Sequence, residues 1–266
     1  MSPTPYLAFA RASFHKMLAY RLRYYTGIFS YLIYVSTYYY LWKSIFAAGG
    51  GSLSGFRLDE MVTYVAVGWL ARSFFFNNVD RDIADLVAEG EIATQLARPV
   101  SFQGMMVASA LGESAFRLLF FSLPIALVLF LLYPISKPAS PAHLAAFLLS
   151  SLLALAVLVH INFLVGISAL RLKSIQGVMR AKHYLIELLS GLLLPLSFFP
   201  AWLDALSRLL PFQALAWVPA SIYLGRVSGG ALVLALLGQA SWAAALALLS
   251  AWAWKRAAAR LSVQGG

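Results

Sequence analysis

The chain has 266 residues, of which 61% are hydrophobic and only 11% are charged, and it has no cysteine. Soluble domains carry roughly 25% charged residues, so the composition excludes an ordinary soluble domain, and the lack of cysteine excludes disulfides and thiolate metal sites. The net charge of +10 does not require a nucleic-acid partner, because membrane proteins concentrate Lys and Arg beside anionic lipid. We predict an all-α polytopic membrane protein that forms one transmembrane domain over residues 1–266.

The N-terminal residues 1–24 are predicted to form an amphipathic helix along the membrane interface. Within residues 6–23, the apolar side chains of Leu7, Ala10 and Phe14 recur at helical spacing, and basic residues occupy the other sides. An ordinary basic flank of the first span is the alternative.

Apolar segments of about 20 residues, each long enough to cross a hydrocarbon core, predict six membrane spans. The predicted spans are 25–47, 60–78, 103–133, 143–170, 183–200 and 229–253. The third is long, and Pro124 permits a bend in it. Thirteen Lys and Arg residues flank the spans on one side and five on the other, so we expect the first side and both termini to face the cytoplasm.

One face of the first span is rich in tyrosine. Residues at spacings of three and four place a small residue and several aromatic rings on the same side of a helix. These residues are Tyr24, Gly27, Tyr31, Tyr34 and Tyr38. The face is either an interface with a second copy or paralogue of the chain, or a surface for packing within the chain and in the aromatic belts of the membrane.

Six polar residues within the spans are candidates for a polar passage, because ionisable groups are costly in a membrane and face protein or water. They are Arg72, Glu113, Arg117, His160, Asn162 and Glu187. Glu113 and Arg117 are spaced to form an i,i+4 pair, and Glu187 follows basic residues in the sequence. Purely structural pairing is the favoured interpretation, since each carboxylate has a basic neighbour.

The connection over residues 79–101 holds five of the ten carboxylates of the chain. Ile83, Leu86 and Val87 form one apolar face of a short helix, and acidic residues point elsewhere. Gly90 permits a turn, and Pro99 ends a second short helix. We predict a helical hairpin on the cytoplasmic surface that docks onto a partner protein; a solvated loop is the alternative.

Residues 200–225 are apolar but interrupted by prolines, which leaves pieces too short to cross a bilayer. Backbone groups in hydrocarbon must be satisfied by protein, so we predict short re-entrant helices near 201–210 and 213–223. A loose periplasmic loop is the alternative, and it fits the apolar composition poorly.

The chain has no sequence motif for nucleotide hydrolysis. The glycine-rich "GGGSLSGFR" lacks the lysine of a phosphate-binding loop, and the four histidines are scattered, so no metal site and no cofactor of this chain is predicted. The sequence therefore predicts a chain that is not an enzyme.

Three features together resemble the permease subunit of ABC-2-type transporters, in the branch with six spans and about the length of this chain. They are the N-terminal interfacial helix, "EGEIATQLARPVS" after the second span, and "LPLSFFPAWLDALSRLLPFQALAWVPASIYLG" before the last span.

The resemblance implies an exporter in a bacterial inner membrane, built from two permease chains, identical or paralogous, and two cytoplasmic ABC ATPase subunits that bind ATP and Mg. It implies that the connection after the second span is a coupling helix that docks onto the ATPase, and that the first and fifth spans contact the second permease. The implied docking residues are Asp82, Ile83, Leu86, Val87, Glu89, Gly90 and Glu91. A secondary carrier driven by an ion gradient and a membrane-embedded enzyme acting on lipid are the rival interpretations.

Overall fold

The computed structural model describes residues 4–19, 22–49, 52–172 and 174–259, with only the backbone of 22–25 and 49. Within these ranges the regular structure is helical. The helices are α1 (Thr4–Ala19), α2 (Leu22–Gly49), α3 (Leu58–Phe75), α4 (Val79–Ala88), α5 (Ile92–Leu96), α6 (Phe102–Arg117), α7 (Leu123–Leu132), α8 (Pro141–Ile167), α9 (Gln176–Leu189), α10 (Ala201–Leu209), α11 (Trp217–Tyr223) and α12 (Gly229–Ala258).

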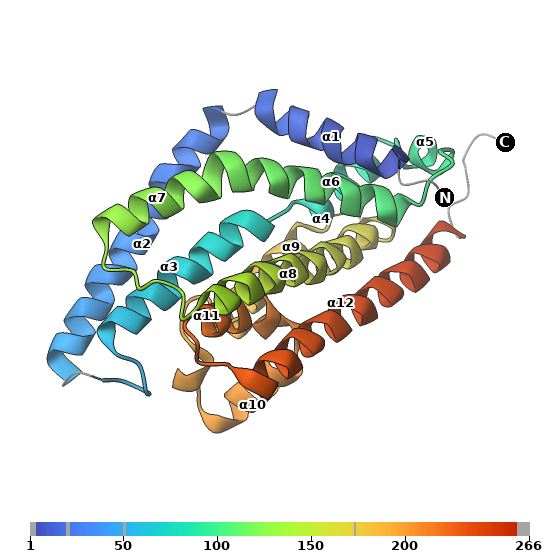
Figure 1. Cartoon of the computed structure of the whole chain (residues 1–266). Coiled ribbons are helices and arrows are strands. Elements are labelled where there is room, and N and C mark those ends of the chain that lie inside the picture. The colour runs from blue at the N-terminus through green and yellow to red at the C-terminus, as the bar shows by residue number, and fades with distance from the viewer. Residues whose placement is uncertain (1–3, 20–21, 50–51, 173, 260–266) are drawn as a thin grey trace.

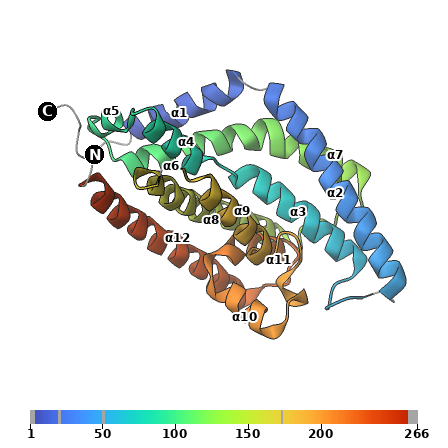
Figure 2. The ribbon, with the colours of Figure 1, turned by 180° about the vertical axis from the view of Figure 1, so that it is seen from behind.

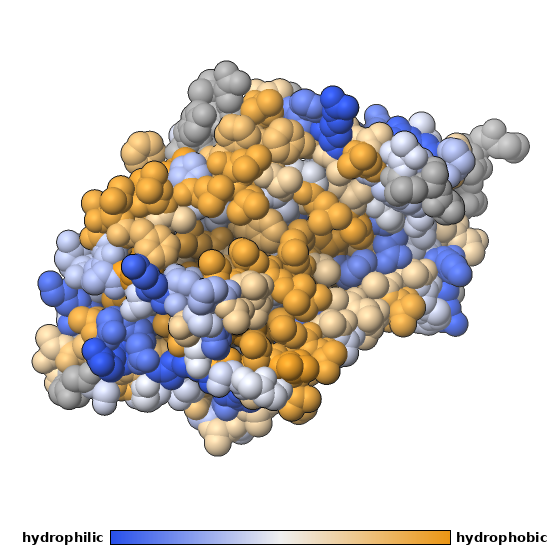
Figure 3. Space-filling view, viewed as in Figure 1, coloured by the Kyte–Doolittle hydropathy of each residue, from blue (hydrophilic) through white to orange (hydrophobic). Residues whose placement is uncertain are grey.

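The long helices form a bundle around α8, which contacts α3, α4, α6, α11 and α12. Helices α4 and α5 lie at one end of this bundle and α10 lies at the other, as both ribbon views show (Figures 1 and 2). We call these the α4 end and the α10 end. The surface between them is largely apolar over α7, α8 and α12, and hydrophilic residues gather towards the two ends (Figure 3). This distribution suits a protein that crosses a bilayer.

Three described helices are long and apolar enough to cross a membrane: Phe102–Leu132, Pro141–Leu170 and Gly229–Ala258. They correspond to the predicted third, fourth and sixth spans. Helices α2, α3 and α9 lie in the regions of the other three, but they do not meet the same criteria of length and apolar composition. An all-α membrane protein is therefore confirmed, and the number of six spans stays a prediction.

The predicted bounds of the fifth span, 183–200, are wrong. Helix α9 begins at Gln176 and ends at Leu189. Gly191 then adopts a φ of 80°, a left-handed conformation that only glycine adopts readily. The hydroxyl of Tyr64 donates to the Gly191 carbonyl at 2.5 Å, which fixes the break. Pro195, inside the predicted span, was a sequence signal for a break, but it did not place the break at Gly191.

The predicted third span is one continuous helical segment whose geometry changes in the middle. A π-helical turn over Leu118–Ser122 joins α6 to α7, and Pro124 follows directly. Proline has no backbone N–H and its ring collides with the carbonyl four residues earlier, so a widened turn at this place relieves the conflict.

Helix α1 packs along α6. A side chain at Gly112 would place its Cβ 1.9 Å from the carbonyl oxygen of Ala10, and Gly104 is covered by the ring of Tyr6. Gly104, Ala108 and Gly112 thus form a strip of small residues that lets the two backbones approach closely. Leu7, expected on the apolar face, is 70% exposed, and the interfacial position of α1 stays a prediction.

Residues 200–225 contain α10 and α11, joined by a short turn over Pro211–Ala214. These helices lie close to the predicted positions. Helix α11 is buried against α3 and α8, and the Gln239 side chain of α12 donates to the Ala214 carbonyl at 2.8 Å. A protein group thus satisfies the broken backbone, as burial in hydrocarbon requires. Re-entry into the membrane stays a prediction.

Candidate functional site

The acidic connection forms a helical hairpin at the α4 end. Helix α4 is followed by a turn in which Gly90 adopts a φ of 74°, a conformation that favours glycine. The short α5 ends before Pro99. The Ser101 hydroxyl then accepts a hydrogen bond from the Gly104 N–H at 3.2 Å and caps α6. These limits agree with the turn signals in the sequence.

The apolar side of α4 packs inward against α8. Ile83 is completely buried, and a Cβ added to Gly166 would lie 2.9 Å from the Ile83 side chain. Leu86 and Val87 pack against the same core and are half-buried. Ile83 was predicted to dock onto a partner, but it lies beneath the surface, because Gly166 opens a space for it on α8.

The acidic rim of the hairpin is exposed. Asp82, Glu89, Gly90 and Glu91 lie on the surface. Neighbouring atoms nevertheless crowd the Asp82 carboxyl, and this desolvation raises its pKa to about 6, while the charge of Lys16 acts in the opposite direction. The hairpin therefore offers a surface of negative and half-buried apolar residues, and its docking role stays a prediction.

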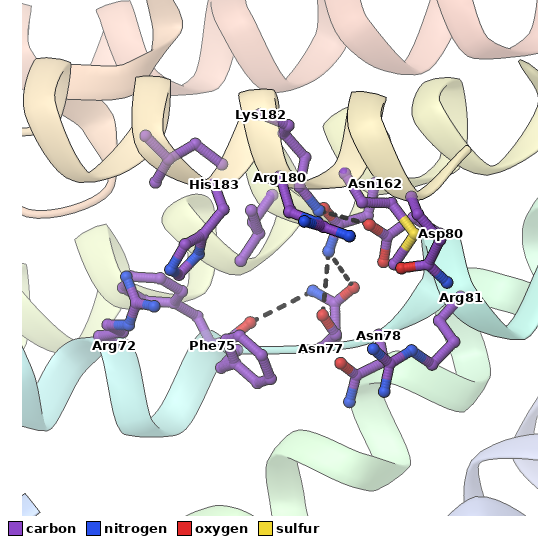
Figure 4. A pocket seen from close by; sticks show the side chains of 15 residues that line it. Arg72, Phe75, Asn77, Asn78, Asp80, Arg81, Asn162, Arg180, Lys182 and His183 are labelled. Carbon is purple, nitrogen blue, oxygen red and sulfur yellow. Dashed lines mark hydrogen bonds and ion pairs between the residues drawn. The ribbon is translucent and has the colours of Figure 1, made fainter. Parts of the chain in front are cut away.

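A buried polar network joins the start of α4 to α8 and α9 (Figure 4). The Lys182 ammonium donates to the Asp80 carboxylate at 2.5 Å and to the Asn162 Oδ1 at 2.6 Å. The Asn162 amide donates to the Asn77 carbonyl at 3.0 Å and to its Oδ1 at 2.9 Å. The Asp80 side chain is only 4% exposed and that of Lys182 15%. Each buried polar group thus has partners, which is the condition under which a buried ion pair persists.

The network borders a cavity of about 230 Å³ between the end of α3, the start of α4, α8 and α9. Most of the residues that line it are polar or charged and five are apolar, but apolar atoms supply the larger share of its surface. The lining residues are Arg72, Phe75, Phe76, Asn77, Asn78, Asp80, Arg81, Leu158, Asn162, Gln176, Met179, Arg180, Lys182, His183 and Ile186.

Glu187 pairs with Arg72 and His183 rather than with Arg180 or Lys182. Its carboxylate lies 3.6 Å from the Arg72 guanidinium of α3 and 3.2 Å from the His183 imidazole. Arg180 and Lys182, the basic neighbours in sequence, line the cavity instead. The pair with Arg72 connects α3 to α9 near the cavity.

Glu113 and Arg117 form the pair that their spacing predicts, with 3.0 Å between Oε1 and Nη2. Both side chains are buried, and the Arg117 guanidinium also lies over the Phe76 ring at 5.1 Å. Neither residue lines the cavity, and a place for this pair along a polar passage stays a prediction.

His160 lies away from the cavity lining. Its Nδ1 is 3.4 Å from the Gln103 amide nitrogen, which donates to the Ala247 carbonyl at 2.9 Å. It therefore lies beside a link between α6 and α12. In the part of the chain that the structure describes, no group of three His, Asp or Glu side chains is arranged to hold a metal ion.

The tyrosine face of α2 packs largely within the chain. The rings of Tyr31 and Tyr34 lie 5.6 and 4.9 Å from that of Trp69 on α3, and Gly27 is covered by Phe121. Tyr38 also reaches Trp69, at 6.5 Å. Part of this face thus packs within the chain, while Tyr34 remains 51% exposed. The interface with a second permease chain stays a prediction. The side chain of Tyr24 lies outside the described residues.

The sequence analysis did not identify Asp80, Asn77 and Lys182 as members of one polar network. It also did not identify Gly166 as the residue of α8 against which α4 packs. Asp80 and Lys182 are 102 positions apart, and no local pattern connects them. A signal did exist for the α1 contact, because Gly104, Ala108 and Gly112 follow the small-xxx-small pattern of packed membrane helices.

A protein-family model matches most of the chain. A family model described as ABC-2 family transporter protein matches residues 32–265, which include the hairpin, the cavity and the short helices of residues 200–225. The curated proteins searched contain no match to the chain. Because the family match covers most of the sequence and the structure is that of a multi-pass helical membrane protein, the chain belongs to the ABC-2 family of transporter permease subunits.

Proposed function

We propose that this chain is the membrane-spanning subunit of an ATP-driven exporter. In this proposal it forms the translocation pathway with a second permease chain, identical or paralogous, and couples to two separate ABC ATPase subunits that bind ATP and Mg. The α4 end faces the cytoplasm of a bacterial inner membrane, and both termini are cytoplasmic. The excess of Lys and Arg flanking the spans on this side supports the orientation.

The observation that carries the proposal is the attachment of α4 to the bundle. A coupling element needs an exposed surface for the ATPase and a firm connection to the membrane helices. Asp82, Glu89 and Glu91 supply the exposed surface, while Ile83 seated on Gly166 and the Asp80–Lys182 ion pair supply the connection. A displacement of α4 would thereby reach α8 and α9 directly.

The polar side chains between α3 and α9 support a pathway near the cavity. Arg72 and Glu187 form an ion pair at 3.6 Å, with side chains 12% and 21% exposed, a separation too long for a direct hydrogen bond. We place Arg72, Asn162 and Glu187 along this passage, whereas Glu113 and Arg117 satisfy each other inside the bundle.

Co-purification with a cognate ATPase tests the docking surface. The variant Leu86→Asp with Glu89→Lys alters the apolar and acidic parts of the hairpin surface and should abolish the complex and the ATPase activity that the permease stimulates. Asp204→Asn, which neutralises one partner of a partly exposed ion pair on α10, should leave both unchanged. Unimpaired assembly of the hairpin variant would refute the docking role.

The rival carrier makes a different prediction. It requires transport by this chain alone in liposomes under an imposed ion gradient without ATP. The exporter requires that transport depends on the ATPase subunit and on hydrolysable ATP, so the same liposomes separate the two functions.

A further inference from the structure

The cavity beside the network is surrounded by positive charge. Arg72, Arg81, Arg180 and Lys182 line it, together with His183, and Asp80 is the only carboxylate among the lining residues of the described chain. Asp80 is already neutralised by Lys182 at 2.5 Å. The Glu187 carboxylate lies beside Arg72 and His183, so Arg81 and Arg180 supply the positive charge that is left over at this space.

Two of these cations have no ionic partner of their own. Within the described ranges, neither Arg81 nor Arg180 forms an ion pair. Arg81 comes from α4 and Arg180 from α9, and Figure 4 shows the two side chains at the same cavity with Arg72 towards its other end. Arginine presents several N–H donors in a planar fork that suits oxygen-rich anions.

Two helices also begin at this cavity. Asn77, Asn78 and Asp80 line it at the start of α4, and Gln176 lines it as the first residue of α9. The N-cap residue of neither helix makes a side-chain cap bond. The first N–H of each helix donates over a long distance to a nearby side chain, Val79 to Asn77 Oδ1 at 3.4 Å and Gln176 to Ser174 Oγ at 3.5 Å. The first N–H groups of a helix have no intrahelical acceptor and carry a partial positive charge, so both helix starts add to the attraction for an anion.

We propose that this cavity binds an oxyanion of the phosphate class. Its volume of about 230 Å³ suits a phosphate group or a small headgroup. The anion would accept hydrogen bonds from Arg81 and Arg180, the two lining arginines without an ion pair among the described residues. The source is either the headgroup of an acidic lipid or a free phosphate compound. The assignment rests on the cavity alone and does not depend on the proposed exporter function.

Native mass spectrometry of the purified full chain tests the proposal. The probes are phosphatidylglycerol and phosphatidylcholine with identical acyl chains, titrated in detergent. We expect preferential binding of phosphatidylglycerol, and a weakening of about 10-fold in Arg180→Gln and in Arg81→Gln, because a hydrogen bond to a charged group contributes about one decade of affinity or more. Arg171→Gln, which removes an exposed charge outside the lining, should bind as the parent does.

A competition experiment distinguishes the sources. If millimolar inorganic phosphate or pyrophosphate displaces phosphatidylglycerol, the oxyanion alone suffices and a free phosphate compound is a ligand. If the lipid stays bound, the ligand is a lipid headgroup, and its acyl chains contribute to binding. Equal binding of both lipids, or equal loss in Arg171→Gln and the two cavity variants, would overturn the proposal. The two cavity variants change arginines on different helices, α4 and α9. Thermal unfolding of each variant shows whether a loss of binding comes from a loss of folded protein.

Discussion

The contact between α4 and α9 can be tested by breaking the Asp80–Lys182 pair from either side. Lys182→Gln leaves the Asp80 carboxylate, with a side chain only 4% exposed, without its cation, and it removes a donor from Asn162. Asp80→Asn leaves Lys182 with the Asn162 acceptor and with a side chain that is 15% exposed. The lysine substitution should therefore be the more harmful of the two.

The magnitudes follow from burial. Removing one partner of a buried ion pair costs about 3–5 kcal/mol, which we expect for Lys182→Gln. For Asp80→Asn we expect about 2 kcal/mol, the contribution of a hydrogen bond to a charged group. Asp204→Asn is the matched control, because the Asp204–Arg208 pair is also short, at 2.8 Å, but its side chains are 28% and 46% exposed. Exposed pairs contribute at most about 1 kcal/mol.

Denaturant titration in detergent, followed by the fluorescence of the seven tryptophans, gives the free energy of unfolding. The double variant Asp80→Asn with Lys182→Gln should lose about 2 kcal/mol less than the sum of the single variants, because the two groups act on each other. Trypsin provides a local readout: Lys182→Gln should speed cleavage after the exposed Arg81 at the start of α4. Additive losses, or a loss no larger than that of Asp204→Asn, would refute the idea that this pair holds α4 to the bundle.

Three further predictions concern packing and pH. Gly112→Ala should destabilise the chain by about 1–3 kcal/mol and expose α1 to protease, because the new Cβ meets the Ala10 carbonyl. Gly177→Ala is the control: Gly177 has open space around it, so this variant should stabilise the chain by up to about 1 kcal/mol. Gly166→Ala should loosen α4 and lower permease-stimulated ATPase activity without loss of ATPase binding, and normal coupling would count against the packing argument. The pKa of Asp82 is about 6 in the folded chain, above its ordinary value of 3.8. At a pH between these two values folding takes up a proton, so the free energy of unfolding falls as pH rises from about 4 to 7. Asp82→Asn should remove this part of the pH dependence in denaturant titrations.

The limits of the acidic hairpin could be predicted from the sequence because local chemistry determines them. Gly90 is needed for a left-handed turn, and Pro99 disfavours helix at the residue before it. The short helices of residues 200–225 were predictable for the same reason, since prolines separate them. The i,i+4 pair of Glu113 and Arg117 depends only on helical spacing.

The partners across the bundle could not be predicted. The distance between Asp80 and Lys182 along the chain carries no local signal, and the same holds for Ile83 and Gly166. The end of α9 depends on Tyr64, which binds the Gly191 carbonyl from another helix. The direction of the tyrosine face also depends on a distant residue, Trp69. Helical periodicity shows which residues share one side of a helix, but it does not show which distant residue packs against that side.

The acidic residues of α4 divide into two groups because of helix geometry. Asp80 and Asp82 are two positions apart, which places them about 200° apart around the helix axis. Asp80 therefore turns inward to Lys182, while Asp82 stays at the exposed rim. A carboxylate at position 80 stabilises the attachment of α4, whereas those at the rim lie on the surface that we propose meets the ATPase. Charge reversal at the rim should thus impair assembly and spare stability, while neutralisation of Asp80 should lower stability first. The two effects are separable only because α4 is a helix whose apolar stripe, marked by Ile83, faces α8.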